Sequence, residues 1–543
     1  MGSKINGKIP VIIGVTGHRD LRKEDIGILR EAVREQIGAV RAKCPHSEVR
    51  VMTSLAEGAD QLCAETALEM GLDIITVLPM PAEEYAEDFK GEPLNKFSGL
   101  YEKTLNKFSA PHKEEFRAGR DYLYRQAENY IAEHSHVLLA LWDGEEEGDE
   151  YAGTAATVRA KLGYRANEVA GEQLKKSDGA VIQIVTPRQS SDNQAMKAGK
   201  VYLHGDVARS DRILSDTDSY NRDCGEMAAQ IPADAGQAAE ESGPQDRIRD
   251  RVQQKVQEVY NAADSLSVIN AVRHRRTLIG LSTCATVLTI AFLLYDEAEW
   301  QTMIILCGFM IIALFAINKF TRMTGFHSRY IEYRVLAEAC RVQNYLRSAG
   351  SSCEVTEIMP WNLQVTVPWV NRAMAAVMIG ERSGIQQSIV EMWIRDQADY
   401  QKSAFKRSEK QMKRNDLIVG VGLAVSIISY FGALAFEIIC CGMLGGENMF
   451  TPEVNDTVRA GIKIAMGTFS AFTLFANNYY GNLALPNVID DHRKMMLLYE
   501  EAEREIADKG EAEPLLIRIA EDELGENANW YAYQSKHEPG MDI

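Results

Sequence analysis

The sequence predicts an α/β domain with a parallel sheet and helices on both faces, followed by an all-α membrane region with four helices in two hairpins. Short β-rich runs alternate with helical stretches over the first 190 residues, a pattern typical of parallel sheets. Long runs without charged residues occur only after residue 270. We therefore divide the chain into an α/β domain at 1–190, an extension and polar linker at 191–250, and a helical membrane region at 251–543.

The α/β domain rests on five strand candidates with helical segments between them. Residues 24–43 illustrate the helical pattern, because Leu29, Val33 and Ile37 recur near 3.6-residue spacing. Strands that alternate with such helices form parallel sheets. The strands are expected at 10–15, 49–53, 73–78, 137–142 and 180–186.

Composition excludes some classes of partner. The 77 Asp and Glu residues outnumber the 59 Lys and Arg residues, which gives a net charge of −18 at pH 7. General attraction to nucleic acid is therefore not expected, and any anion must be held by a local arrangement of groups. The nine cysteines form no C-x-x-C pair and no zinc spacing. We expect no metal site and no required cofactor.

Four runs in the last zone are candidate membrane spans, at about 277–295, 300–318, 417–437 and 461–485. The fourth is the weakest, because it contains the polar sequence ANNYYGN. Lys and Arg precede the first and third spans and follow the second, whereas the link between the first two has neither. The positive-inside rule then predicts a multi-pass protein with both termini in the cytoplasm.

Three asparagines of the fourth span are candidates for lining a pore: Asn477, Asn478 and Asn482. Amide side chains at membrane depth are costly unless they face protein or water. The alternative is an interfacial segment in which Tyr479 and Tyr480 form an aromatic belt.

In the α/β domain, four segments share one feature, since each directly follows a predicted strand. They are GVTGHRD (14–20), SLAEGAD (54–60), LPMPAEEY (78–85) and WDGEEEGDEYAGTAATV (142–158). All strands of a parallel sheet end at the same edge, and ligands of doubly wound folds bind there. These segments are therefore expected to form one binding site.

The chemistry of these segments suits a phosphate or a nucleotide. Glycines allow close approach of the main chain, helix amino ends offer free N–H groups, and Arg19 adds charge. The carboxylates of Glu57, Asp60 and Asp143 suit ribose hydroxyls better than phosphate. Taken singly, a Gly-x-x-Gly turn or a loop histidine is more often structural. The candidate ligand-binding residues are Gly14, Thr16, Gly17, His18, Arg19, Ser54, Glu57, Gly58, Asp60, Pro79, Asp143, Gly153, Thr154 and Ala155.

These four motifs, in this order over residues 8–190, resemble the SLOG superfamily. That group includes the lonely-guy phosphoribohydrolases, DNA-processing protein A and the N-terminal region of melastatin-type TRP channels. The resemblance implies a Rossmannoid fold that binds nucleotides or nucleotide-derived ligands.

One position departs from the lonely-guy enzymes, which carry a Gly-Gly-x-Gly-Thr-x-x-Glu loop whose glutamate helps to cleave the N-glycosidic bond. Here Tyr151 and Ala152 replace the first glycines, and Thr157 stands in the place of the glutamate. A hydroxyl cannot stabilise an oxocarbenium-like centre as a carboxylate does. The resemblance therefore favours a ligand sensor over an enzyme, with no catalytic residue assigned.

The membrane region resembles SLATT-type effector regions in the sequences SRYIEYRVLAEACRVQNYLRSAG, WIRDQADYQKSAFKR and LGENANWYAYQSKHEP. The two resemblances together imply a homo-oligomeric effector of the bacterial inner membrane. It would sense a nucleotide messenger, of cyclic-nucleotide or ADP-ribose type, and open a pore or disrupt the bilayer in antiphage defence.

Two other functions remain open at this point. The chain could be a membrane-anchored nucleosidase or NAD-type glycohydrolase that uses Glu57, Asp60 or Asp143. It could also be a membrane scaffold or channel whose α/β domain senses nothing.

Overall fold

The computed structural model describes residues 7–112, 119–145, 153–163, 179–190, 196–227, 251–380, 387–441, 449–481, 485–509 and 512–536. The chain divides into two compact units, each assembled from separate segments. The first unit contains Met1–Leu266, Glu332–Val390 and Ala512–Ala528. The second contains Ser267–Ile331, Glu391–Glu511 and Asn529–Ile543.

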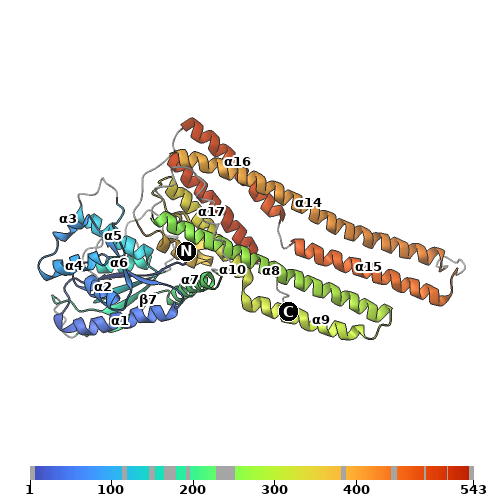
Figure 1. Ribbon diagram of the computed structural model, residues 1–543, viewed down its shortest axis with the longest axis horizontal. Helices are drawn as coiled ribbons and strands as arrows, with labels where there is room; N and C mark the ends of the chain where they lie inside the picture. Colours follow the sequence, from blue (N-terminus) through green and yellow to red (C-terminus); the bar gives the residue numbers. More distant parts are fainter. Residues whose placement is uncertain are drawn as a thin grey trace, which may run out of the picture. The chain divides into compact units, whose positions relative to one another are not determined.

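A seven-stranded sheet forms the centre of the first unit (Figure 1). The strand order is β4-β3-β2-β1-β5-β6-β7, and every pair of neighbours is parallel except β6 and β7. The expected α/β domain with a mainly parallel sheet is thus confirmed. The strands are β1 (Val11–Gly17), β2 (Val49–Thr53), β3 (Asp73–Leu78), β4 (Asn106–Ser109), β5 (Val137–Trp142), β6 (Ala180–Val185) and β7 (Val201–Gly205).

Two of these strands, β4 and β7, were not expected from the sequence. β4 has four residues, of which only Phe108 is buried. β7 lies at the antiparallel edge, where Tyr202 and Leu203 are both exposed, so it lacks the in-out alternation that marks a half-buried strand. β7 comes from the segment that the sequence indicated as an extension.

Helices cover both faces of the sheet. On one face, Leu29 and Val33 of α1 share a buried cluster with Val11 of β1. On the opposite face, Ile131 of α5 lies against Gly14 of β1. The helices of this domain are α1 (Ile26–Lys43), α2 (Ala59–Glu69), α3 (Ala82–Ala86), α4 (Glu92–Glu102), α5 (Arg120–His134), α6 (Thr154–Lys161) and α7 (Val207–Met227), and a 3-10 turn at Lys23–Asp25 precedes α1.

Lys161, the last residue of α6, ties this helix to the carboxyl end of α5. Its side chain is buried, and Nζ donates hydrogen bonds to the main-chain oxygens of Ala132, at 2.9 Å, and of Ser135. The last carbonyls of a helix have no partner within the helix and attract cations. The ammonium group therefore fixes the ends of α5 and α6 to each other.

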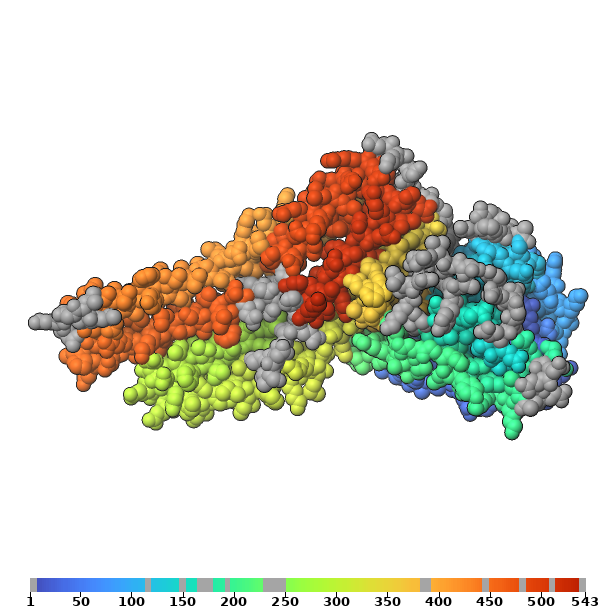
Figure 2. Space-filling model, turned by 180° about the vertical axis from the view of Figure 1, so that it is seen from behind, coloured from blue at the N-terminus to red at the C-terminus, as the bar shows by residue number. Residues whose placement is uncertain are grey.

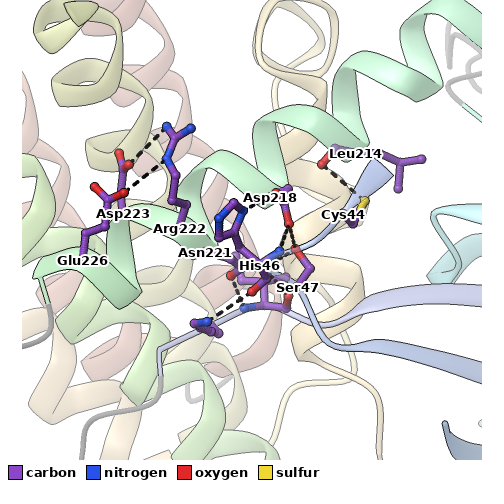
Figure 3. Close-up of polar contacts among 11 residues, drawn as sticks. Cys44, His46, Ser47, Leu214, Asp218, Asn221, Arg222, Asp223 and Glu226 are labelled. Carbon is purple, nitrogen blue, oxygen red and sulfur yellow. Dashed lines mark hydrogen bonds and ion pairs between the residues drawn. The ribbon is translucent and has the colours of Figure 1, made fainter. Parts of the chain in front are cut away.

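Polar contacts of α7 attach it to the start of β1 and to the turn before β2 (Figure 3). The side chain of Asn221 accepts a hydrogen bond from the main-chain nitrogen of Ile9 and donates one to its oxygen, both at 2.8 Å. The carboxylate of Asp218 accepts hydrogen bonds from His46 and Ser47 at 2.7–2.8 Å. α7 is thereby part of the α/β domain.

His46, Ser47 and Asp218 are the residue types of a hydrolytic triad, but they are not arranged as one. The Ser47 hydroxyl and the Nδ1 atom of His46 both bind the Asp218 carboxylate, at 2.7 and 2.8 Å. A nucleophilic serine needs the imidazole, not the carboxylate, as the acceptor of its proton. The trio therefore has a structural role.

The first unit also contains helices from the second half of the sequence, and a buried ionic network joins two of them. Arg341 of α10 donates to Glu338, at 2.7 Å, and to Glu523 of α17, at 2.9 Å. Arg334 binds the same Glu338 and, at 2.9 Å, Asp264 of α8. The helices involved in this layer are α8 (Arg251–Glu297), α10 (Phe326–Ser348), α11 (Val355–Ile358), α12 (Trp361–Thr366), α13 (Pro368–Val377) and α17 (Ala512–Lys536).

The second unit is helical throughout the part of it that the structure describes. Three helices there are long and apolar enough to cross a membrane: Arg251–Glu297, Met303–Ser348 and Met392–Ile439. Their apolar side chains lie on the surface, with Ile305 and Phe309 of α9 exposed to 74% and 64%. This suits contact with lipid. The first of these stretches is α8, the second is α9 (Met303–Thr324) continued by α10, and the third lies in α14 (Gln387–Ile439); the other helices of the unit are α15 (Pro452–Gly481) and α16 (Leu485–Lys509).

Three of the four expected spans fall on these helices, and the fourth is not confirmed. Residues 461–481 are helical as part of α15, but α15 does not meet the same standard of length and apolarity among the described residues. Its first half carries charged side chains, including Arg459 and Lys463. Residues 482–484 lie outside the described part of the chain.

α14 and α15 lie side by side, as both Figure 1 and Figure 2 show. Their contact needs small residues, because a Cβ atom on Gly422 would lie 2.4 Å from Oγ1 of Thr473. Near the other end of the pair, Arg459 of α15 donates to the carboxylate of Glu437 at 2.5 and 2.7 Å. The two helices thus form an antiparallel hairpin.

Candidate ligand-binding site

A cavity of about 490 Å³ lies at the carboxyl edge of the sheet. Successive strands run from β1 outward through β2 to β4 on one side, and from β5 through β6 on the other. The chain thus reverses its direction of strand addition between β1 and β5, and ligands of doubly wound folds bind at such a point. The cavity is lined by Val15, Thr16, Gly17, His18, Arg19, Asp20, Ser54, Ala56, Asp60, Pro79, Asp121, Tyr124, Ala127, Glu128, Ile131, Gly153, Thr154, Thr157 and Arg188.

The structure brings together most of the residues that the sequence assigned to the site. Thr16, Gly17, His18, Arg19, Ser54, Asp60, Pro79, Gly153 and Thr154 line the cavity. Gly14, Glu57, Gly58, Asp143 and Ala155 are not among the lining residues. Of these, Glu57 is exposed and Ala155 is buried in α6. Tyr151 and Ala152 lie outside the described residues.

Two glycines of the site are required by contacts within the domain. A Cβ atom on Gly17 would lie 2.5 Å from that of Ala59 and 2.8 Å from the carbonyl oxygen of Leu141. Gly58 has φ of +85°, and a Cβ atom on it would lie 2.3 Å from the carbonyl oxygen of Arg19. These residues therefore let the loops after β1 and β2 touch each other beside the cavity.

The buried carboxylate of Asp60 organises the loop after β2. Its Oδ2 atom accepts hydrogen bonds from the hydroxyls of Thr53, at 2.8 Å, and Ser54, at 2.9 Å, and from the main-chain nitrogen of Ser54. Burial raises the pKa of Asp60 even though these donors oppose the shift. Within this loop Leu55 is buried with φ of +56°, a strained conformation for a non-glycine residue. Asp60 thus positions the loop and is occupied in doing so.

Asp143 similarly joins three segments behind the cavity. Its carboxylate lies 3.1 Å from Nε2 of His18 and accepts a hydrogen bond from Nε of Arg188 at 2.8 Å. Burial alone would raise the pKa of Asp143, but the amide of Glu145 together with His18 and Arg188 lowers it. The carboxylate therefore stays ionised and holds Arg188 at the edge of the cavity, while the main-chain nitrogen of Asp143 donates a hydrogen bond to Nε2 of His18 at 3.1 Å.

Arg19 brings a positive charge to the cavity. Its guanidinium carbon lies 5.3 Å from the ring centre of Tyr124, which is a cation–π distance. Tyr124 is in turn held by a short hydrogen bond to Asp88. Among the described residues no carboxylate lies within ion-pair distance of Arg19, so its charge is available to an anion.

The amino end of α6 meets the side chain of Glu128 from α5. The main-chain nitrogen of Gly153 donates a hydrogen bond to Oε2 of Glu128 at 3.2 Å. Burial raises the pKa of Glu128 to about 7, against the opposing effects of Gly153 and the Thr157 hydroxyl. A carboxyl group from α5 thus lies beside Thr157, the residue that stands in the place of the lonely-guy glutamate.

α5 and Arg188, which follows β6, are parts of the site that the sequence did not predict. Asp121, Tyr124 and Glu128 line the cavity from one face of this helix. Their spacing of three and four residues is visible in RDYLYRQAENYIAEH, and it marks one face of a helix. Nothing in the sequence indicates that this face turns toward the ends of β1 and β5.

The three pore candidates are placed only in part. Asn477 lies in α15 with an exposed side chain. Asn478 belongs to the same helix, but the structure describes its main chain only. Asn482 lies outside the described residues.

No protein-family model matches this chain, and no curated protein matches it significantly.

Proposed function

We propose that the α/β domain binds a nucleotide-derived ligand, of cyclic-nucleotide or ADP-ribose type, in the cavity at the end of β1 and β5. We further propose that this binding controls the membrane helices of an oligomeric effector, which opens a pore or disrupts the bacterial inner membrane in antiphage defence. The ligand would act by its higher affinity for one of two states of the protein.

The observation that carries the proposal is the convergence of separate segments on one cavity. The loops after β1, β2 and β3, the amino end of α6 and one face of α5 all contribute to the 490 Å³ space. The Arg19 guanidinium and a helix amino end favour phosphate. A volume of this size suits a nucleotide-sized ligand.

The membrane part of the proposal is supported by the three apolar helices. The chain passes from the first unit to the second within α8, at Leu266 and Ser267, without an intervening loop. A change in the first unit can therefore act on a helix that continues into the apolar region. Antiphage defence and the cytoplasmic position of both termini rest on the resemblance and on the charge pattern of the sequence.

The test is dye leakage from liposomes that contain the purified full-length protein. A panel of cyclic nucleotides, NAD and ADP-ribose is added, and at least one of them should release the dye. Arg19→Glu should abolish this response, because it reverses the available charge in the cavity. Arg41→Glu makes the same charge change on the exposed surface of α1 and should respond like the wild type. Dye leakage without ligand, or equal leakage from the two variants after ligand addition, would contradict the proposed sensor function.

A second candidate function is a membrane-anchored nucleosidase, and one observation favours it. The carboxyl group of Glu128 lies at the amino end of α6, beside Thr157, and a raised pKa suits a general acid. Incubation of the full-length protein with NAD and nucleoside monophosphates distinguishes the two functions. Release of free base that Glu128→Gln abolishes would favour the enzyme.

A further inference from the structure

The amino end of α6 already holds an oxyanion, and it is part of the protein itself. Gly153 has φ of +99° and directs its N–H group to Oε2 of Glu128 at 3.2 Å. The next residues, Thr154 and Ala155, begin the helix, where N–H groups have no partner inside the helix. Because the carboxylate accepts this hydrogen bond inside the cavity, it stands where a phosphate oxygen of a ligand would bind.

The amino end of α2, which also lies near the cavity, is less suited to a phosphate than that of α6. The first N–H group of α2, at Ala59, donates to the carbonyl oxygen of His18 at 3.0 Å. The first turn of α2 also carries the carboxylate of Asp60, which would repel an anion. The available positive charge comes from Arg19, which has no ion-pair partner in the described part of the chain.

We propose that Glu128 is a built-in competitor for the phosphate group of the ligand. An anionic ligand binds at Gly153 only when the Glu128 carboxyl is protonated, so that binding of a phosphate is accompanied by proton uptake at every pH at which Glu128 is ionised in the free protein. This proposal deepens the proposed function, since it rests on phosphate binding in the same cavity.

The charges around Glu128 support proton uptake on binding. Its pKa of about 7 is the net result of burial and of Asp60 of α2, which raise it, and of the Gly153 N–H group, the Thr157 hydroxyl and Arg19, which lower it. Thr157 of α6 contributes a hydroxyl, and the other titratable or charged side chains of the cavity are His18, Asp20, Asp121, Tyr124 and Arg188. A phosphate at Gly153 would add negative charge beside the carboxyl, so the protonated form would dominate in the complex. The neutral carboxyl could then donate a hydrogen bond to a phosphate oxygen.

The sign of the pH effect follows from this linkage. With a pKa of about 7 in the free protein, Glu128 is mostly protonated near pH 6 and mostly ionised near pH 8. The affinity for a phosphodiester or pyrophosphate should therefore fall about tenfold from the lower to the higher pH. Such probes carry no group on their phosphates that titrates in this range.

The experiment is calorimetric titration of the full-length protein in detergent with ADP-ribose and with cyclic AMP. Wild-type protein should bind at least one probe about tenfold more weakly near pH 8, and two buffers of different ionisation enthalpy should reveal proton uptake near pH 7. Glu128→Gln keeps a hydrogen-bonding amide but cannot ionise, so it should bind with one affinity at both pH values. Glu102→Gln removes the same charge from exposed α4 and should retain the wild-type pH dependence.

The outcomes separate this inference from the proposed function. Binding that is independent of pH and takes up no proton overturns the role of Glu128 and leaves the ligand site intact. Weaker binding by Glu128→Gln at the lower pH, with an unchanged circular-dichroism spectrum, also overturns it, because Glu128 would then be a needed ligand contact. Absence of binding by both proteins at both pH values contradicts the phosphate site itself.

Discussion

Nε2 of His134 lies 3.2 Å from Oε2 of Glu354, and both side chains are buried. Nδ1 of the same ring donates to the carbonyl oxygen of Tyr130, at 3.0 Å, so Nδ1 carries a proton. The pair then needs one further proton, either on Nε2 or on the carboxyl group. This contact joins the end of α5 to the segment that follows α10.

Breaking this pair should destabilise the first unit. Glu354→Leu leaves the imidazole buried without its partner, and we expect a loss of about 3–5 kcal/mol in the free energy of unfolding. Glu354→Gln keeps an acceptor at the same place and should lose less than half of that amount. Urea unfolding followed by circular dichroism measures both. Equal losses for the two variants would mean that packing, and not the polar contact, is decisive.

Glycine substitutions should separate close contact from simple helix propensity. Gly17→Ala places a Cβ atom 2.5 Å from that of Ala59, which requires movement of the main chain, so we expect a loss of about 1–3 kcal/mol. Gly38→Ala lies in α1 with open space around it and should gain about 0.5–1 kcal/mol. Thermal unfolding of the two proteins provides the comparison, and a stabilised Gly17→Ala protein would contradict the close contact between the loops.

The stability of the α/β domain should depend on the ionisation of Glu128 without any ligand. Its pKa in the folded protein is about 7, above the usual 4.5, so the folded state binds the proton more tightly than the unfolded state. Stability should be full below about pH 4.5 and should fall as the pH rises through 7, by about 1–2 kcal/mol after allowance for partial exposure. Glu128→Gln should lack this loss, as unfolding curves at several pH values will show. If the free energy of unfolding of Glu128→Gln fell more steeply with pH than that of the wild type, the loss could not be assigned to Glu128.

The ionic network should hold the C-terminal helix in the first unit. Arg341→Met leaves Glu338 and Glu523 without their shared partner, and we expect about 3–5 kcal/mol of destabilisation. Limited proteolysis should then cut near the start of α17 faster than in the wild type. The control is Arg518→Met, which removes an arginine from α17 but leaves Arg341 in place. Equal cleavage rates in the two variants would show that the network does not anchor this segment.

The α14–α15 hairpin should tolerate a larger residue at one glycine and not at another. Gly422→Val introduces a Cβ atom 2.4 Å from Oγ1 of Thr473, whereas Gly420→Val enters open space. We expect Gly422→Val to lower the melting temperature in detergent by several degrees and Gly420→Val to leave it nearly unchanged. Equal melting temperatures would indicate that the two helices do not pack through this face.

The sequence was informative where one local pattern decides the structure. β1, β2, β3, β5 and β6 are apolar runs bounded by turns, and α1 has a clear period, so both could be predicted. β4 and β7 could not, because a four-residue strand and an exposed edge strand have no distinctive pattern. The loops after parallel strands could be assigned to one edge from topology alone. The participation of Tyr124 and Glu128 depends on how α5 packs across β1, which is a tertiary contact.

The same limit applies to the carboxylates expected to suit ribose hydroxyls. The structure gives Asp60 and Asp143 hydrogen-bond partners within the protein, which the sequence does not indicate. A sequence shows which groups could accept a hydrogen bond, and only the packed structure shows which acceptors are already used. The expectation that the membrane region forms a pore or disrupts the bilayer depends on its resemblance to SLATT-type effector regions, and its own packing does not indicate it.

Lys161, the last residue of α6, makes the two ends of this helix unequal. Because its Nζ atom donates hydrogen bonds to two carbonyl oxygens at the end of α5, the two helices are held together there. At the amino end of α6, Glu128 contacts the main-chain nitrogen of Gly153 and the Thr157 hydroxyl. A ligand that displaces Glu128 from Gly153 would therefore separate α5 from the amino end of α6, while Lys161 keeps the other end of α6 in place.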